Sequence, residues 1–124
     1  MAVLVDHAQY RVELTDSGIF AVSAKGAFDE VTVADFERQT EGHVLRLAPL
    51  RYLNDATLLH DASLSAFWSL AKLVKRRLHL VKRSAVCGVS PNKRLLVNGV
   101  LRAAGRKSAQ VFERRDDAER FLLE

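Results

Sequence analysis

Two strand-like segments open the sequence, and short apolar runs then alternate with segments that have the spacing of amphipathic helices. Residues 10–14 alternate apolar and polar side chains, residues 15–18 are turn formers, and residues 19–26 form a second strand-like run. Strands that alternate with helices are typical of a mainly parallel sheet, and the opening hairpin adds an antiparallel edge. The predicted fold class is therefore α/β, with a mixed, mostly parallel sheet of about five strands and helices packed on it.

The other elements are assigned from periodicity, caps and breakers. Thr32 is expected to cap the first helix and Gly42 to end it, with Val33, Phe36 and Thr40 facing the core. Further helices are predicted from a cap at residue 61 or 63 to about residue 78, over residues 91–103, and over residues 116–123. Further strands are predicted over residues 50–54, 85–89 and 109–112.

Three boundaries depend on single residues. Pro49 cannot donate to a sheet ladder, so residues 44–55 do not form one central strand, and residues 44–47 are either an approach or a helix end. Leu64, Phe67, Ala71, Val74 and Leu78 have the spacing of one helix face. Gly105 is expected to stop the third helix, and Asp116 and Glu119 have the spacing of a capping box at the fourth.

Composition restricts the class of protein. The 124 residues predict one domain over 1–124, and no apolar run approaches the roughly 18 to 20 residues of a membrane span. The first residues lack a signal-peptide pattern, so a cytoplasmic protein is expected. Cys87 is the only cysteine, which excludes an intramolecular disulfide and a cysteine-based zinc set, and its apolar strand predicts a buried thiol. No metal site is expected, because no two of the histidines have the spacing of a helical metal site (His7, His43, His60, His79).

Basic residues are concentrated in the second half of the chain. Residues 1–62 carry a net charge of −5 and residues 63–124 a net charge of +9. The densest group is Lys72, Lys75, Arg76 and Arg77, where cations also suit the end of a helix. Such a patch could meet an anionic protein or membrane surface. Nucleic acid is an improbable partner, because only Trp68 nearby could supply an exposed aromatic ring.

The stretch Gly-Val-Ser-Pro joins a strand to a helix and has two interpretations. Ser90 is a good helix cap and Pro91 suits the first turn, so the junction can be purely structural. Free backbone N–H groups at a helix start also bind anions, and Lys93 and Arg94 would help them. The structural interpretation is favoured, because every helix start offers such groups.

Residues 86–122 carry a resemblance to a known family. A strand ends in a small-residue turn, a helix and a short strand follow, and "DDAERFLLE" closes the chain. This segment resembles the C-terminal half of STAS domains, the sulphate-transporter and anti-sigma-factor-antagonist modules, with their sporulation-antagonist-like relatives. The resemblance implies a single STAS-like domain and a non-enzymatic regulatory role. Its implied partner is another protein, such as an anti-sigma-type kinase.

The same family implies a phosphate acceptor. Antagonist members carry Asp-Ser-Ser-Gly at a helix start, and the second serine accepts the phosphate. The sequence "HDASLSAF" is similar, with Asp61 and Ser63 in the aspartate and acceptor places. "NDATLL" is a rival placement, with Asp55 and Thr57. Both have alanine at the first serine and lack the glycine, so the chain is closer to looser relatives that resemble lipid-binding CRAL-TRIO domains as well.

Two functions remain open, with nucleic-acid binding through Lys72 to Arg83 as a weaker third, and none of them is catalytic. One is a regulatory interaction module that uses the surface around Asp61 and is switched at Ser63, although serine is also a common helix cap. The other is a carrier of a small hydrophobic or anionic ligand between sheet and helices, as the lipid-binding relatives imply. No nucleophile elbow or triad supports an enzyme. No cofactor is expected, and a homodimer is compatible with the sequence.

Overall fold

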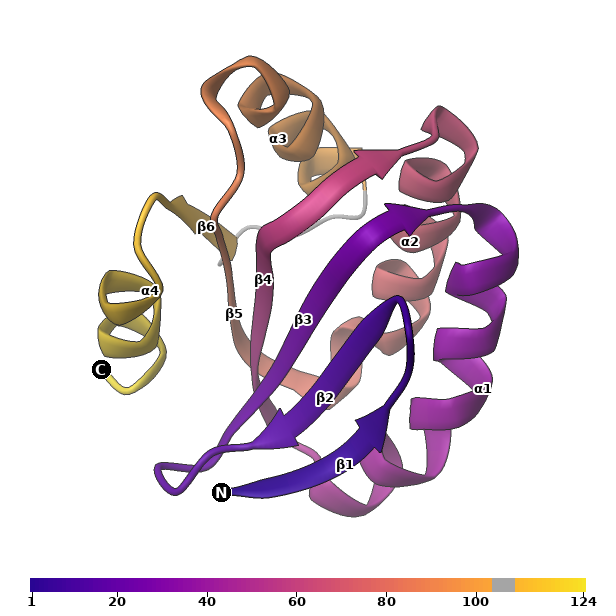
Figure 1. Cartoon of the computed structure of the whole chain (residues 1–124). Helices are drawn as coiled ribbons and strands as arrows, with labels where there is room; N and C mark the ends of the chain where they lie inside the picture. Colours follow the sequence, from indigo (N-terminus) through magenta and orange to yellow (C-terminus); the bar gives the residue numbers. More distant parts are fainter. Residues whose placement is uncertain (104–108) are drawn as a thin grey trace.

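The six strands of the computed structural model form one mixed sheet, in which the spatial order follows the chain order (Figure 1). The structure describes residues 1–103 and 109–124. The strands are β1 (Ala2–Asp6), β2 (Tyr10–Leu14), β3 (Ile19–Phe28), β4 (Leu50–Ala62), β5 (Val81–Cys87) and β6 (Ala109–Phe112). The first three pair antiparallel, and β3 to β6 pair parallel. The predicted fold class is confirmed, with β1 as an additional edge strand.

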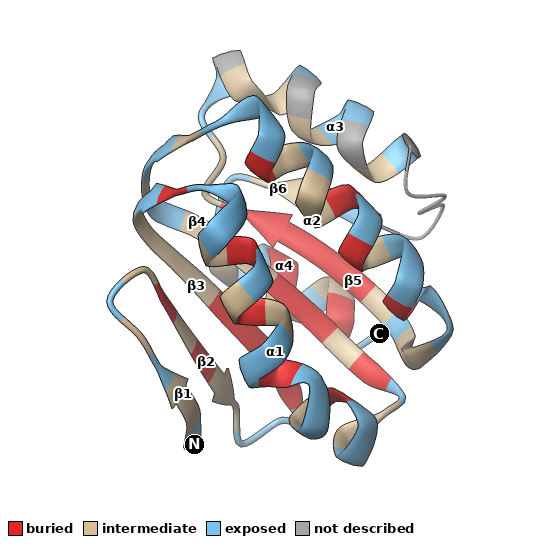
Figure 2. Ribbon diagram, turned by 90° about the vertical axis from the view of Figure 1, so that its right-hand side faces the viewer, coloured by how far each residue is buried: buried red, intermediate tan, exposed pale blue. Residues whose placement is uncertain are grey.

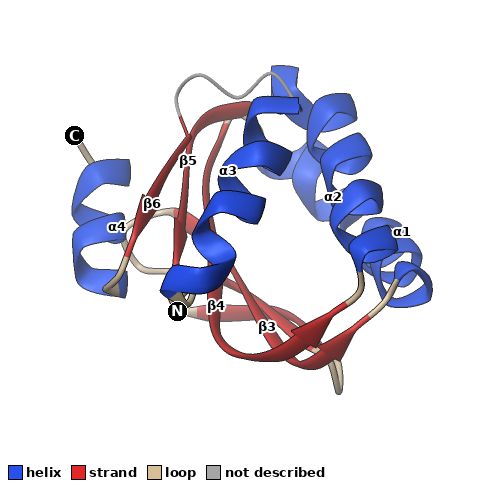
Figure 3. Ribbon diagram, turned by 90° about the horizontal axis from the view of Figure 1, so that it is seen from above, coloured by secondary structure: helices blue, strands red, loops and turns tan. Residues whose placement is uncertain are grey.

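Four α-helices cover the two faces of this sheet unequally. They are α1 (Glu30–Leu47), α2 (Leu64–Arg77), α3 (Arg94–Ala103) and α4 (Arg115–Leu122). Short 3₁₀ turns precede β5 (Leu78–Leu80) and α3 (Pro91–Lys93). Figure 3 shows α1, α2 and α3 on one side of the sheet and α4 on the other. The larger core therefore lies under the first three helices.

The first four residues of β3, Ile19 to Val22, are buried on both faces of the sheet, which explains why they form an unbroken apolar run. Successive side chains of a strand point to opposite faces. Phe20 and Val22 belong to the core under α1 and α2, whereas Ile19 and Ala21 belong to the core under α4. The buried positions in Figure 2 follow the central strands and the inner sides of the helices. A strand in this position needs no polar alternation.

Helix α1 begins earlier and ends later than predicted. Asp29 caps it by accepting a hydrogen bond from the Thr32 backbone N–H at 2.8 Å, so Thr32 is not the cap. The helix continues through Gly42 to Leu47, because burial of Val44 one half-turn later outweighs the cost of about 1 kcal/mol for glycine in a helix. The expected inner face is confirmed: Val33, Phe36 and Thr40 are buried.

Other boundaries were predicted with mixed success. Residues 44–47 are a helix end, as one of the two alternatives had it, and β4 begins directly after Pro49. The predicted strand 50–54 is shorter than β4, which continues to Ala62. The predicted strand 85–89 begins and ends later than β5, which spans Val81–Cys87. The helix over 91–103 is confirmed, with a 3₁₀ first turn, and Gly105 lies outside the described residues. The capping box of α4 is not formed, since Asp116 pairs with Arg114 instead.

Helix α2 begins at the Ser63 cap, whose hydroxyl accepts from the Ala66 N–H at 3.1 Å. Its buried apolar residues are Ala66, Ala71 and Leu73. The prediction that Leu64 and Leu78 belong to the core face was wrong. Both are exposed, because they lie at the two ends of the helix, beyond the turns that the sheet and α1 cover.

Arg77 is buried between α2 and α1 and does not belong to a surface patch as predicted. Its guanidinium donates to the Thr40 hydroxyl and to the Glu37 carbonyl oxygen, each at 2.9 Å. Thr40 in turn donates to the Phe36 carbonyl at 2.7 Å. Burial of the charge is tolerated because its donors have partners. Arg77 thereby fixes the end of α2 against the middle of α1.

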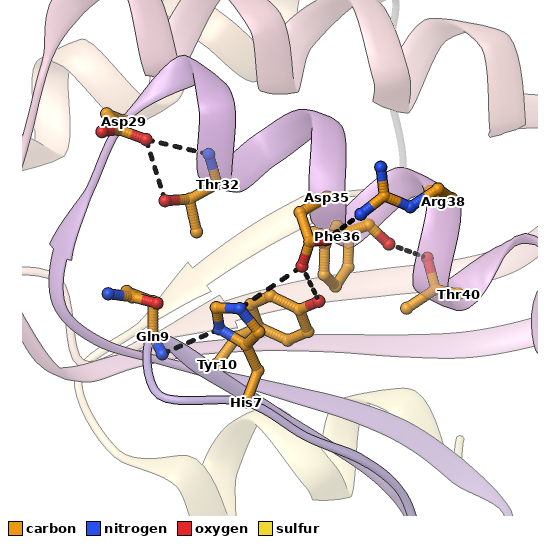
Figure 4. Close-up of polar contacts among 9 residues, drawn as sticks. All are labelled: His7, Gln9, Tyr10, Asp29, Thr32, Asp35, Phe36, Arg38 and Thr40. Carbon is orange, nitrogen blue, oxygen red and sulfur yellow. Dashed lines mark hydrogen bonds and ion pairs between the residues drawn. The ribbon is translucent and has the colours of Figure 1, made fainter.

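A second polar cluster joins the β1–β2 turn to α1 (Figure 4). The Tyr10 hydroxyl donates to Asp35 at 2.8 Å, and the His7 ring stacks on the Tyr10 ring with its Nε2 3.4 Å from the same carboxylate. Arg38 pairs with the other carboxylate oxygen. Burial, with the bond to Asp35, raises the pKa of Tyr10 well above its usual range. This cluster holds the edge of the sheet against the helix.

Candidate functional site

A cavity of about 600 Å³ lies between the sheet and helices α1, α2 and α3. Its lining is mostly apolar. The sheet and α1 contribute Val22, Ala24, Phe28, Phe36, Leu59, Ala62 and Val86; α2 contributes Phe67, Leu70 and Val74; α3 contributes Val97 and Leu101. Cavities of roughly 300–1,000 Å³ with apolar walls and a few polar groups are typical of small-molecule sites.

The cavity exists because small residues meet where a packed interior would need large ones. Ala24 on β3, and Ala56 and Ala62 on β4, line it directly. Close-packed protein interiors contain few voids larger than a water molecule. Because these alanines are short, the side chains of the sheet do not fill the space beneath α2 and α3.

The chain just after β5 lies against the middle of β4 at the cavity wall. Gly88 has a φ of +76°, and a Cβ there would lie 2.3 Å from the Thr57 Oγ1 and 2.6 Å from the Thr57 backbone nitrogen. Only glycine suits both the backbone conformation and the space. The small-residue turn is visible in the sequence, whereas this contact is not.

The polar part of the lining is formed by Asn54, Asp55, Thr57, Ser90, Lys93, Arg94 and Glu113. The first three lie within β4 beside the end of β5, and the other four follow the carboxyl ends of β5 and β6. The structure thus brings Thr57, Ser90, Lys93 and Arg94, all singled out in the sequence, to one cavity. Asp61 is exposed near the end of β4 and is not part of the lining.

Asp55 is ionised and held by neighbours. Its Oδ1 accepts from the Thr57 hydroxyl at 2.6 Å and N–H at 3.0 Å, and its Oδ2 lies 3.2 Å from Arg115 of α4. Burial alone would raise the pKa of Asp55, but these hydrogen bonds and the Arg115 charge outweigh it and hold the pKa below its usual value. Asp55 therefore connects the cavity to the opposite face of the sheet.

Cys87 lies beneath this network and is fully buried, as its apolar strand predicted. Burial, with the neighbouring Asp55 carboxylate, raises the pKa of Cys87 to about 12. The thiol is therefore protonated at neutral pH, and its position does not suit a nucleophile.

The two candidate phosphate acceptors are both exposed but differ in surroundings. Ser63 caps α2, and its hydroxyl also lies 3.0 Å from that of Ser65. The Thr57 hydroxyl donates a hydrogen bond to Asp55, and it lies directly beside the Gly88 backbone. Only Ser63 has a hydroxyl at the start of a long helix.

The basic patch is smaller than predicted. Lys72, Lys75 and Arg76 are exposed, whereas Arg77 is buried. Arg76 is itself engaged, with two nitrogens bound to the Glu37 carboxylate at 2.7–3.2 Å. Within residues 1–103 and 109–124, no cluster of potential metal ligands is found, and no helix has the length and hydropathy needed to cross a membrane.

No family model and no curated protein matches this sequence. Solved structures do. An uncharacterized protein of the DUF3478 family from Shewanella loihica PV-4, with a SpoIIAA-like fold, matches with a TM-score of 0.70 and 22% identity over 91% of each chain. The anti-sigma factor antagonist SpoIIAA in its unphosphorylated form matches with a TM-score of 0.60 and 9% identity, over 87% of this chain and 91% of that one. With its mixed sheet and its helices on both faces, this chain has a SpoIIAA-like fold.

Proposed function

We propose that this chain is a non-catalytic binding domain that holds a small, mainly apolar ligand in the cavity beneath α2 and α3. The observation that carries the proposal is the cavity itself, about 600 Å³ with walls from three helices and the sheet. At roughly 30 Å³ for each water-sized group, it holds about twenty such groups. Apolar walls of this extent with a few polar groups are typical of small-molecule sites, so a ligand is a physical explanation for the cavity.

The test fills the cavity from one wall. Ala24 lines it from β3, whereas Ala27 on the same strand is exposed. Nile red, an uncharged dye that fluoresces in apolar surroundings, is expected to bind the unaltered protein saturably with one site. Ala24→Leu abolishes this binding, and Ala27→Leu retains it. Absence of saturable dye binding to the unaltered protein, or equal binding by both variants, contradicts the proposal.

A second candidate function, switched binding to a partner protein, rests on a different surface. Leu58, Leu64 and Trp68 are 55%, 60% and 50% exposed. Leu58 lies near the end of β4, and the other two lie in the first turns of α2, beside the exposed Ser63. One structural relative is an anti-sigma factor antagonist solved in its unphosphorylated form. Phosphate on Ser63 would sit favourably at the helix start and would change this surface, and an anti-sigma-type kinase would be its source.

This candidate is tested at the modification itself. The protein isolated from its own cells is digested and mapped by mass spectrometry. Phosphate is expected on the peptide that contains Ser63, lost in Ser63→Ala and retained in Ser65→Ala, which alters the adjacent hydroxyl. A peptide without phosphate under all growth conditions contradicts the switch.

A further inference from the structure

The charged residues of the cavity lining are gathered at one end, and only some of them have ion-pair or hydrogen-bond partners. Four charged residues contribute to it: Asp55, Lys93, Arg94 and Glu113. Lys93, Arg94 and Glu113 follow the carboxyl ends of β5 and β6, and Asp55 lies within β4 opposite the last residue of β5. The charge is therefore gathered at one end of an otherwise apolar space.

The two acidic groups of the lining do little to balance its cations. Asp55 is bound to Thr57 and to Arg115, whose charge balances it. The Glu113 side chain is 80% exposed, and its carboxylate reaches only to 3.8 Å from Arg94. At that distance and exposure an ion pair contributes little. Neither acid therefore neutralises the cavity end.

The two cations retain unused binding capacity. Lys93 is partly buried and forms no ion pair with any described residue. The Nε of Arg94 is buried and has no hydrogen-bond partner in the described part of the chain. The end of the cavity therefore favours an anion.

We propose that the ligand is an amphipathic anion, with an apolar chain or ring in the cavity and a carboxylate or phosphate head paired with Lys93 and Arg94. The inference rests on the proposed ligand-binding function and specifies its substrate class. The walls contributed by α2 take the apolar part. The head group balances the charges of Lys93 and Arg94, which the acids of the lining leave largely uncompensated.

Three ligands with one tail and different heads test the charge. Decanoate, decanol and decyltrimethylammonium are compared by their ability to displace Nile red. Decanoate is expected to bind about tenfold more tightly than decanol, which corresponds to one hydrogen-bonded charge pair. Decyl phosphate in place of decanoate shows which anionic head fits better. Equal binding of decanoate and decanol, or tighter binding of the cationic ligand, overturns the inference.

Variants assign the effect to the two residues. Lys93→Gln and Arg94→Gln are each expected to weaken decanoate binding about tenfold and leave decanol binding unchanged. Arg102→Gln, which removes an exposed cation from the same helix outside the lining, serves as the control. Retained Nile red binding shows that each variant is folded with its cavity intact. If the dye binds but no variant alters decanoate affinity, the inference fails alone; if the dye does not bind the unaltered protein, the proposed function fails with it.

Discussion

Gly88 lies so close to Thr57 that no side chain can be placed between them. A Cβ at residue 88 would come within 2.3 Å of the Thr57 Oγ1, at a backbone φ of +76°. The contact joins the end of β5 to the middle of β4 at the wall of the cavity. It also holds Thr57 where its hydroxyl reaches Asp55.

Gly88→Ala is therefore expected to lower the free energy of unfolding by at least about 2 kcal/mol, from backbone strain and displacement of Thr57. The control is Gly42→Ala in α1, where a Cβ meets nothing within 4 Å. There alanine is expected to raise stability by about 0.5–1 kcal/mol. Urea unfolding measures both. Equal stabilities for the two variants would show that the close approach is absent in solution.

Arg77→Ala is expected to lower the free energy of unfolding by about 2–3 kcal/mol, because it removes two hydrogen bonds and a buried side chain between α1 and α2. Lys75→Ala, two residues earlier on an exposed position, is expected to change it by no more than about 0.5 kcal/mol. Chemical denaturation of the two variants compares the free energy of unfolding lost with the buried cation and with an exposed one. An Arg77→Ala variant with an unchanged free energy of unfolding would rule out the role of Arg77 in holding α2 against α1.

Asp55 predicts a specific dependence of stability on pH. Its pKa is lower in the folded protein than its ordinary value of 3.8. A carboxylate of this kind contributes stability that is present above about pH 4 and is lost as the pH falls through the lower, folded pKa. Asp55→Asn is therefore expected to be less stable than the unaltered protein at neutral pH, with the difference shrinking below about pH 4. A difference that stays constant from neutral to acidic pH contradicts this.

Cys87 is expected to resist thiol reagents. Its pKa of about 12 leaves almost no thiolate at neutral pH, and the side chain is fully buried. Labelling with a chromogenic disulfide is expected to be slow in the native protein and fast in denaturant. Rapid labelling without denaturant would mean that β5 opens readily.

Much of the fold could be predicted, because local periodicity sets most elements. The 3.6-residue spacing of Val33, Phe36 and Thr40 gave the right face of α1. The end of that helix was missed, because the destabilisation from a glycine inside a helix is smaller than the stabilisation from burying Val44. The length of β4 was missed because residues 55–62 have no strand alternation. They are extended because they pair with the end of β3.

The site was only partly predictable. A strand followed by a helix start marks Ser90, Lys93 and Arg94 locally, and the structure places them at the cavity. The cavity itself depends on alanines from separate strands that meet only in three dimensions. The burial of Arg77 likewise depends on Thr40, which is distant in sequence. Spacing within one helix carries no information about such a partner.

The chain-ordered sheet has a consequence for how the protein is made. Because every strand pairs with the one before it, a chain leaving the ribosome can add each new strand to an edge already formed. The wall supplied by α3 comes after five of the six strands. An incomplete nascent chain can therefore hold most of a folded sheet while the cavity stays uncovered, until α3 has been made.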